Sequence, residues 1–260
     1  MCLIAWNWQP DSPTPLLLIA NRDEFYARPT EALHGWPDAP ILAGRDLQAG
    51  GTWLGISRSG RLAALTNHRD PANVKTDAPS RGQLVSGFLN SSTSARDYLD
   101  TLARSADRYN PFNLLVFDGA HLMGLESRHA KVMAMQPGIG AVSNADFLTP
   151  WPKLAHLSGS LQKLLAQQHP SDEQLLTLLH NPRLAADADL PATGIPLALE
   201  RALSAAFVAL PDYGTRACSV VRFEQDSIAF LEQGFDANGS TGTRQITATV
   251  PTSSRQSAAR

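Results

Sequence analysis

Residues that could act as nucleophile and base stand together at the start of the chain. Cys2 follows Met1, and removal of Met1 would place a free α-amine and a thiol on the same residue. An α-amine has a pKa of about 7.7–8.0, so it can accept the thiol proton near neutral pH. A nucleophile with a base beside it suits acyl transfer. This pattern predicts cleavage of an amide or thioester bond through an acyl-Cys2 intermediate.

A predicted hairpin would bring a polar motif beside this thiol. The apolar runs at 3–8 and 16–20 predict two strands, joined by a turn centred on Ser12. In an antiparallel hairpin with that centre, residue 2 pairs with residue 22. A guanidinium at Arg22 would stabilise the thiolate and lower the pKa of the thiol. A carboxylate at Asp23 would orient an ammonium group, so we expect the three side chains to share one site.

Three further polar residues lie at predicted strand ends far along the sequence. Asn67 and Asn144 each end a strand, and Arg216 begins a later one. Asparagine amides held at a strand end are good donors to an oxyanion, although asparagine is also typical of turns. We expect these side chains to converge on one cleft and to reach the region of Cys2.

The second cysteine, Cys218, lies two residues beyond Arg216. Side chains two apart in a strand point to the same face, so Cys218 is predicted to lie at or under the wall of the same cleft. A disulfide with Cys2 would require Cα atoms within about 7 Å of each other. The alternative is a small buried hydrophobic residue, as free cysteine usually is.

The elements that must position these residues form an irregular series of strands and helices. Strands are predicted at 3–8, 16–20, 50–57, 61–67, 112–117, 121–126, 131–135, 140–144, 215–224, 227–231 and 243–250. Helices are predicted at 83–89, 95–108, 151–168, 172–179 and 197–210. Strict alternation of strand and helix is absent, so we expect an α+β fold built mainly from antiparallel sheet. One domain over 1–250 and a flexible tail at 251–260 are predicted.

Composition excludes several classes of function. The 22 Lys and Arg against 24 Asp and Glu give a net charge of −2 without a basic stripe, so no nucleic-acid partner is expected. No apolar run reaches the roughly 18–20 residues of a membrane span. The closest histidines, His121 and His129, have no further ligand at metal spacing, so no metal site is predicted. No secretory signal pattern opens the chain, and a cytoplasmic location is expected.

Several motifs together resemble the NRDE family, which is the family of the transport and Golgi organisation protein 2. The matching segments, in chain order, are Met-Cys-Leu-Ile at 1–4, Asn-Arg-Asp-Glu-Phe at 21–25, Gly-Gly-Thr-Trp-Leu-Gly at 50–55, Leu-Thr-Asn at 65–67, Ser-Asn-Ala at 143–145, Thr-Pro-Trp at 149–151 and Tyr-Gly-Thr-Arg at 213–216. Their order and spacing extend the resemblance over nearly the whole chain.

The resemblance implies both a fold and a set of site residues. The NRDE family is similar to the N-terminal-nucleophile hydrolases, especially the choloylglycine hydrolase and penicillin V acylase branch, which implies a four-layer αββα sandwich. Matched by motif, the site residues of that branch fall on Cys2, Arg22, Asp23, Asn67, Asn144 and Arg216. That branch usually separates the arginine from the aspartate, whereas the two are adjacent in this chain.

Two classes of function follow from this resemblance. The first is a cysteine hydrolase acting on a small amide or thioester substrate. The second is a haem- or lipid-handling protein that uses the same cleft without hydrolysis, because NRDE proteins have been linked to haem mobilisation and lipid homeostasis; a membrane-traffic scaffold is a third alternative. No cofactor is predicted, and haem would be cargo. The chain has no C-x-x-C-H motif, and His68 and Cys2 are the residues available to ligate haem iron.

Overall fold

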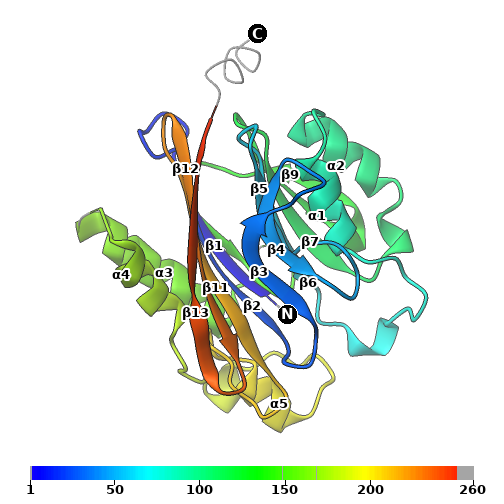
Figure 1. The fold of residues 1–260 in the computed structure, drawn as a ribbon. Helices are drawn as coiled ribbons and strands as arrows, with labels where there is room; N and C mark the ends of the chain where they lie inside the picture. Colours follow the sequence, from blue (N-terminus) through cyan, green and yellow to red (C-terminus); the bar gives the residue numbers. More distant parts are fainter. Residues whose placement is uncertain (1, 148, 168, 251–260) are drawn as a thin grey trace.

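Two antiparallel sheets pack face to face between two layers of helices in the computed structural model, which describes residues 2–147, 149–167 and 169–250 (Figure 1). The helices are α1 (Gly82–Leu89), α2 (Ala95–Ala103), α3 (Pro152–Gln167), α4 (Asp172–Leu179) and α5 (Leu197–Ala202). Helices α3 and α4 cover the outer face of one sheet, and α1 and α2 cover that of the other. The predicted αββα sandwich is confirmed.

The first sheet contains both ends of the described chain. Its strands, in spatial order, are β10 (Gly138–Val142), β1 (Cys2–Trp8), β2 (Leu16–Phe25), β11 (Tyr213–Phe223), β12 (Ser227–Asp236) and β13 (Gly239–Thr249). The second sheet follows chain order: β3 (Thr30–Gly35), β4 (Ile41–Asp46), β5 (Leu54–Ser57), β6 (Leu62–Asn67), β7 (Phe112–Phe117), β8 (Leu122–Glu126) and β9 (Lys131–Ala134). Short 3-10 helices lie at η1 (Pro71–Asn73), η2 (Ala106–Arg108), η3 (Ser127–His129) and η4 (Asp187–Asp189).

Strand β1 shows how the sequence builds three apolar layers. Ile4, Trp6 and Trp8 point into the core between the two sheets. Leu3 and Ala5 point the other way, into the core beneath α3 and α4. A strand that is apolar on both faces must lie inside a sheet that is covered on both sides. The remaining core lies beneath α1 and α2, on the outer face of the second sheet.

Two strands, β3 and β4, have no counterpart among the predicted elements. Strand β3 buries only Leu33, so its sequence lacks the apolar alternation that indicates a strand. Strand β4 has a short apolar run that ends at Gly44. Both strands nevertheless complete the second sheet and form one wall of the cleft described below.

The polar motif is part of strand β2, whereas the predicted strand ends at residue 20. The strand continues to Phe25 because its polar groups find partners inside the protein. The Asn21 amide donates to the backbone carbonyls of Leu179 and Ala206, each at 2.8 Å. A polar side chain can occupy a buried strand when its hydrogen bonds are made.

The predicted helix at 197–210 is wrong in its second half. Helix α5 ends at Ala202. The following segment leaves the helical path, and the backbone N–H of Phe207 donates to the carbonyl of Asn181 at 2.9 Å. The chain thereby passes alongside the start of β11 instead of continuing as a helix.

The predicted strand at 50–57 begins later than expected, at Leu54. The preceding glycines form a loop that touches the start of α1. A Cβ atom on Gly51 would lie 2.4 Å from the carbonyl carbon of Gly82, so this close approach requires glycine. The other predicted strands and helices are present; the bounds predicted for β7 and α4 are those observed, and the remaining elements have shifted ends.

No helix among the described residues is long and apolar enough to cross a bilayer. The predicted tail at 251–260 lies outside those residues, and the single-domain boundary at 250 stays a prediction.

Candidate functional site

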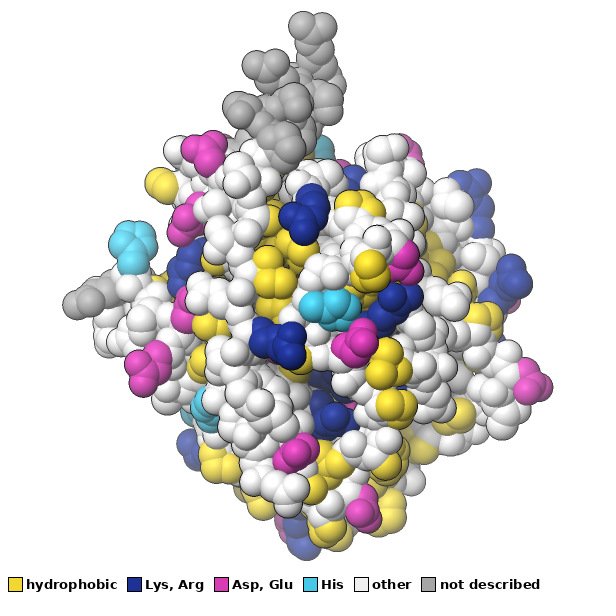
Figure 2. All heavy atoms as spheres, viewed as in Figure 1, with side chains coloured by type: hydrophobic (Ala, Val, Ile, Leu, Met, Phe, Trp, Pro, Cys, Tyr) yellow, Lys and Arg dark blue, Asp and Glu magenta, His cyan; other side chains and the backbone are white. Residues whose placement is uncertain are grey.

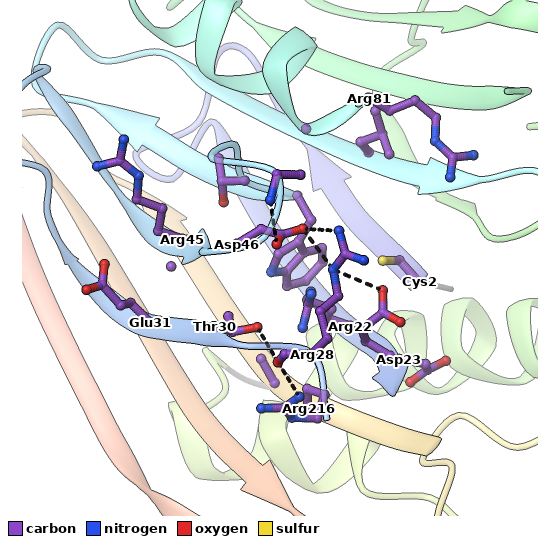
Figure 3. A pocket seen from close by; sticks show the side chains of 18 of the residues that line it. Cys2, Arg22, Asp23, Arg28, Thr30, Glu31, Arg45, Asp46, Arg81 and Arg216 are labelled. Carbon is purple, nitrogen blue, oxygen red and sulfur yellow. Dashed lines mark hydrogen bonds and ion pairs between the residues drawn. The ribbon is translucent and has the colours of Figure 1, made fainter. Parts of the chain in front are cut away.

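A cleft of about 580 Å³ opens where β1 begins and β2 ends, between the two sheets. Figure 3 shows the Cys2 thiol in this cleft together with labelled arginine and carboxylate side chains. Five of the six predicted site residues line this cleft: Cys2, Arg22, Asp23, Asn67 and Arg216. Segments from both sheets and from the loop before α1 therefore meet at one polar site.

The predicted pairing of Cys2 with Arg22 is confirmed in the antiparallel β1–β2 ladder. Both residues fall on the face of the sheet that carries Ile4 and Ala20 toward the other sheet. Beyond these two apolar residues the core between the sheets gives way to the cleft. The hairpin therefore places a thiol and a guanidinium side by side at the edge of the core.

Burial raises the pKa of the Cys2 thiol, and the nearby Arg22 guanidinium opposes only part of this rise. The thiol has 6% relative exposure, so desolvation of the thiolate dominates. The lowering effect predicted for the guanidinium is present, but burial outweighs it, so the net shift of the thiol pKa is upward. Cys2 is therefore a protonated thiol at neutral pH and needs a base to become a nucleophile.

Arg22 is a buried cation that lacks a complete set of hydrogen bonds. The residue is only 7% exposed. Its Nη1 atom is buried and has no hydrogen-bond partner among the described residues. An unmet donor on a buried charge costs free energy, and the cost falls when an anion binds. Arg22 is thus suited to stabilise negative charge that develops beside Cys2.

Asp23 points to the opposite face of β2 from Arg22, because neighbouring side chains in a strand alternate. Its Oδ1 accepts a hydrogen bond from the Thr215 hydroxyl at 2.8 Å. The residue is 1% exposed. Both residues line the cleft, but adjacency in sequence gives them different surroundings, because Asp23 is bonded to Thr215 on the side of the sheet that α3 covers.

Lys153, in the first turn of α3, is a charged residue that sequence reasoning missed. It is 4% exposed, and its Nζ is buried with no hydrogen-bond partner among the described residues. Burial lowers the pKa of Lys153 to about 8, against the opposing attraction of Asp23. A lysine early in a helix usually lies at the surface. The one sequence signal was its place two residues after the Thr-Pro-Trp motif.

The two asparagines occupy different positions relative to the cleft. Asn67 lines it, whereas Asn144 is fully buried and does not. The Nδ2 of Asn144 donates to the Asn67 carbonyl at 2.9 Å, and its Oδ1 accepts from the Ser143 hydroxyl at 3.1 Å. That hydroxyl also lies 3.1 Å from the Cys2 carbonyl. Direct contact of Asn144 with a substrate stays a prediction, and its bonds favour a role in positioning Asn67.

Arg216 is the extra residue of a β-bulge in β11, between Thr215 and Ala217. Its Nη1 donates to the backbone carbonyls of Phe25, Tyr26 and Arg28, at 2.9, 3.1 and 3.2 Å. Its side chain therefore holds the turn between β2 and β3 at the rim of the cleft. A bulge re-aims one side chain and shifts the pairing register at that point of the strand.

The same bulge overturns the prediction for Cys218. Alternation places Arg216 and Cys218 on one face only in a regular strand, and the extra residue reverses that relation. Cys218 packs beneath α4 with Leu175 and Leu179 and is fully buried. Its Cβ points away from the face that carries Cys2, and β2 lies between their strands. A disulfide between the two cysteines is excluded in this fold.

Charges of both signs line the cleft. Arg28 Nη2 lies 2.6 Å from Asp46 Oδ2, and Arg28 Nε lies 3.9 Å from Glu24 Oε2. The charged lining residues are Arg22, Arg28, Arg45, Arg81, Arg216, Asp23, Glu24, Glu31, Asp46, Glu232 and Asp236. The visible surface also intersperses basic and acidic side chains (Figure 2). Such a lining suits a polar substrate that carries its own hydrogen-bonding groups.

A family model described as Transport and Golgi organisation 2 matches residues 1–237. The chain belongs to this family. The Transport and Golgi organization protein 2 homolog of Bos taurus is 34% identical over 96% of this chain and 98% of its own length. The Homo sapiens homolog is 32% identical over 90% of this chain and 92% of its own.

Solved structures of N-terminal-nucleophile hydrolases share the fold. A cysteine-to-alanine mutant of conjugated bile acid hydrolase from Clostridium perfringens superimposes with a TM-score of 0.53 and 8% identity, covering 96% of this chain and 97% of that one. An arginine-to-leucine variant of that hydrolase superimposes with a TM-score of 0.53 and 9% sequence identity, covering 96% of each chain. At this identity the likeness concerns the fold, and activity must be argued from the site.

Proposed function

We propose that this member of the transport and Golgi organisation 2 family hydrolyses an amide or thioester bond through an acyl-Cys2 intermediate. The observation that carries the proposal is the Cys2 thiol at the wall of a polar cleft, directly opposite the incompletely bonded Arg22. A nucleophile beside a fixed positive charge is the pairing that acyl transfer requires.

The chemical step uses groups already placed around the thiol. A base takes the proton of Cys2, and Sγ attacks the carbonyl carbon of the substrate. Arg22 and Asn67 face the oxyanion that forms. The C–N or C–S bond of the substrate then breaks, and the leaving amine or thiol takes the proton. Water attacks the thioester on Cys2, the acid departs, and Sγ regains a proton.

The base must compensate for the raised pKa of Cys2. Removal of Met1 would supply the α-amine of Cys2, whose ordinary pKa is about 7.7–8.0. Lys153 is a second group with a pKa near this range, about 8, and it experiences the charges of Asp23 and Cys2. The mass of the intact protein reports removal of Met1, and a Lys153→Met variant tests the lysine.

The lining of the cleft favours hydrolysis of a polar acyl compound over transport of haem. Its described residues include many charged side chains and no histidine or methionine. A porphyrin needs a mostly apolar site with an axial ligand. Among these lining residues, Cys2 alone offers a soft ligand for iron.

The proposal is tested with a β-lactone probe, which acylates a nucleophilic thiol by ring opening. We expect a mass increase on the peptide that contains Cys2, in the native protein and in Cys218→Ala, and none in Cys2→Ala. Slow loss of the adduct would report hydrolysis. A native protein that forms no adduct, yet shifts the Soret band of added haem, would contradict the proposal and support a carrier.

A further inference from the structure

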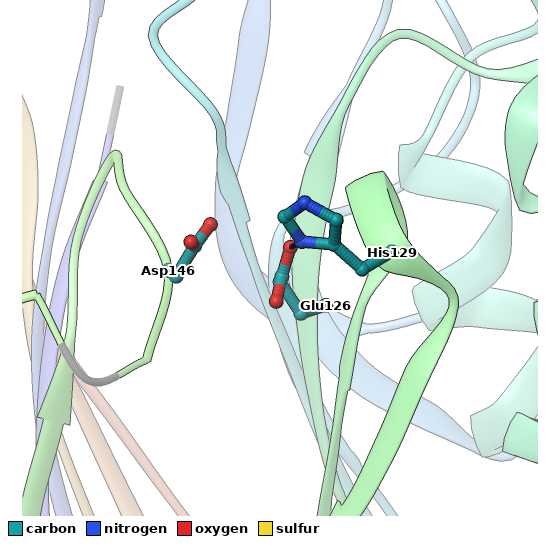
Figure 4. A group of neighbouring side chains, drawn as sticks. All are labelled: Glu126, His129 and Asp146. Carbon is teal, nitrogen blue, oxygen red and sulfur yellow. Dashed lines mark hydrogen bonds and ion pairs between the residues drawn. The ribbon is translucent and has the colours of Figure 1, made fainter.

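Outside the cleft, three metal-ligating side chains face one another across the boundary between the two sheets. Each of Glu126, His129 and Asp146 offers one ligand atom, and these atoms lie within 4.8 Å of one another. Figure 4 shows the Asp146 carboxylate directed from its loop toward the other two side chains. His129 Nδ1 lies 2.7 Å from Glu126 Oε1. No metal site was predicted, because Glu126 and Asp146 are not recognisable as partners of His129 from sequence alone.

His68 lies beside this cluster, outside the group of three, and contacts one of its members, Asp146. Its Nε2 lies 3.3 Å from Asp146 Oδ1, and its side chain is only 9% exposed. His68 Nδ1 is buried without a hydrogen bond to any described residue, and the buried Asp146 Oδ1 has the His68 imidazole as its neighbour. Buried polar atoms in that condition are uncommon and often mark a missing water or ion. The cluster therefore contains unmet acceptor capacity in addition to the right residue types.

We propose that Glu126, His129, Asp146 and His68 bind a divalent transition-metal ion of the zinc class, and that the ion fixes the two sheets together beside the cleft. Imidazole nitrogen and carboxylate oxygen are the usual zinc ligands besides cysteine, with bonds of about 2.0–2.2 Å. In a tetrahedron with bonds of about 2.1 Å, neighbouring donors lie about 3.4 Å apart. The His68 to Asp146 separation of 3.3 Å already matches that spacing.

The surroundings permit an ion to enter and to displace the present partner. His129 is exposed and gives access from solvent, whereas Glu126 forms the buried wall of the site. The exposed Arg128 places Nη1 3.3 Å from His68 Nε2, so a cationic side chain now lies beside the proposed ligands. If the Arg128 side chain moved out into solvent, Nε2 of His68 would be free to bind the ion. The attraction of the cluster for a positive charge is thus visible in its own contacts.

The location gives the ion a defined structural role. His68 directly follows Asn67 at the end of β6, and Asp146 follows Asn144 by two residues. These two asparagines are joined by the bond from Asn144 Nδ2 to the Asn67 carbonyl, and Arg69 N–H donates to the Asn144 carbonyl at 2.7 Å. An ion bound to His68 and Asp146 would restrict the relative movement of Asn67 and Asn144. The metal site holds independently of whether Cys2 is a catalytic nucleophile.

The test is thermal unfolding and calorimetry of the full chain with zinc chloride, after the protein has been stripped with EDTA and freed of the chelator. We expect binding of one ion, and a Tm higher by about 5–10 °C at a zinc concentration 100 times the Kd. Magnesium should give no shift, because it prefers all-oxygen octahedral sites. Absence of a zinc-induced shift in the native chain would overturn the proposal.

Variants assign the ligands. His129→Ala alters an exposed side chain, and Asp146→Asn keeps the shape of the residue, so both should fold and both should lose the zinc-induced shift. His121→Ala is the matched control, because His121 is also exposed and is also next to a carboxylate, with Nδ1 3.7 Å from Asp118 Oδ1. This variant should keep the zinc-induced shift in Tm. Cys2→Ala should keep it too. Zinc binding retained in both ligand variants, or lost in Cys2→Ala, would contradict the assignment.

Discussion

The two ends of the space between the sheets are built by the same strands and contain opposite kinds of side chain. At the far end, Trp8, Phe117 and Phe223 pack edge to face, with ring centroids 5.4 and 5.0 Å apart. At the near end, the same strands β1 and β2 present Cys2 and Arg22 to the cleft. Apolar contacts stabilise the first region. In the second region, buried charged groups lower the free energy of unfolding and supply the reactive side chains of the candidate site.

The largest expected difference lies in access to the two thiols. Cys2 lines the cleft, whereas Cys218 is fully buried beneath α4. Burial raises the pKa of both thiols, and that of Cys218 well above its ordinary value. Iodoacetamide should therefore alkylate Cys2 faster by on the order of 10⁴-fold, because a core thiol reacts only after the protein opens, at a cost approaching the global free energy of unfolding.

Peptide mapping after timed alkylation measures this ratio, and alkylation in denaturant shows that both thiols are competent. Equal rates in the folded protein would remove the distinction between the two environments. They would also argue that Cys2 is an ordinary strand residue, which favours the carrier function over hydrolysis.

The next largest effect is expected at the aromatic end. Phe117→Ala removes a ring that contacts both Trp8 and Phe223 and is only 2% exposed. The free energy of unfolding should fall by about 3–5 kcal/mol, as for other buried phenylalanines. Urea denaturation measures the change. Alkylation of Cys2 by iodoacetamide in the folded variant should keep its native rate.

The matched control is Leu184→Ala, since Leu184 is 53% exposed and its truncation should change stability by about 0.5 kcal/mol or less. If Phe117→Ala also altered the rate of Cys2 alkylation, the aromatic end and the cleft would be energetically coupled and would not be independent regions.

The smallest of the three effects concerns Lys153 and has the opposite sign. Burial lowers the pKa of Lys153 from 10.5 to about 8, so between these values the unfolded chain binds more protons than the folded chain. Stability therefore rises with pH across this window. Below it, the buried ammonium costs about 3 kcal/mol. Lys153→Met should stabilise the protein by up to that amount at pH 7, and the gain should vanish as the pH approaches 10.5.

Urea denaturation of the native chain and of Lys153→Met at several pH values between 7 and 10.5 measures whether the substitution raises or lowers the free energy of unfolding. Lys153→Arg is a useful second variant, because it keeps the charge and should show no gain at pH 7. A Lys153→Met protein that is less stable than the native chain at neutral pH would show that the ammonium forms a favourable interaction in the folded state.

The hairpin at the site was predictable because its geometry is local. Two apolar runs and one turn determine which residues of β1 and β2 oppose each other, and the pairing of Cys2 with Arg22 followed directly. The convergence of Asn67 and Arg216 on the same cleft was expected from strand ends and from the resemblance to known motifs. These signals depend on residue type and order, which the sequence contains.

The features that escaped prediction depend on contacts between distant segments. The bulge at Arg216 leaves no mark in its own sequence, yet it decides which face Cys218 occupies. Strand β3 is defined by its pairing with β4 rather than by its own apolar pattern. The burial of Lys153 arises from the packing of α3 on the first sheet, and the residue types in the first turn of α3 do not indicate that its lysine is buried.

The pairing of β2 with β11 has a consequence for how the protein forms. The Tyr213 hydroxyl donates to the Asp23 carbonyl, 190 residues away in sequence. The pairing of β2 with β11 joins the two halves of the first sheet. A ribosome must therefore synthesise most of the chain before β2 can acquire its second neighbour. Until then the apolar edge of β2 stays open to other chains. Assembly of the cleft is thus a late, slow event of high contact order, and a chain truncated before β11 would keep its nucleophile without a site around it.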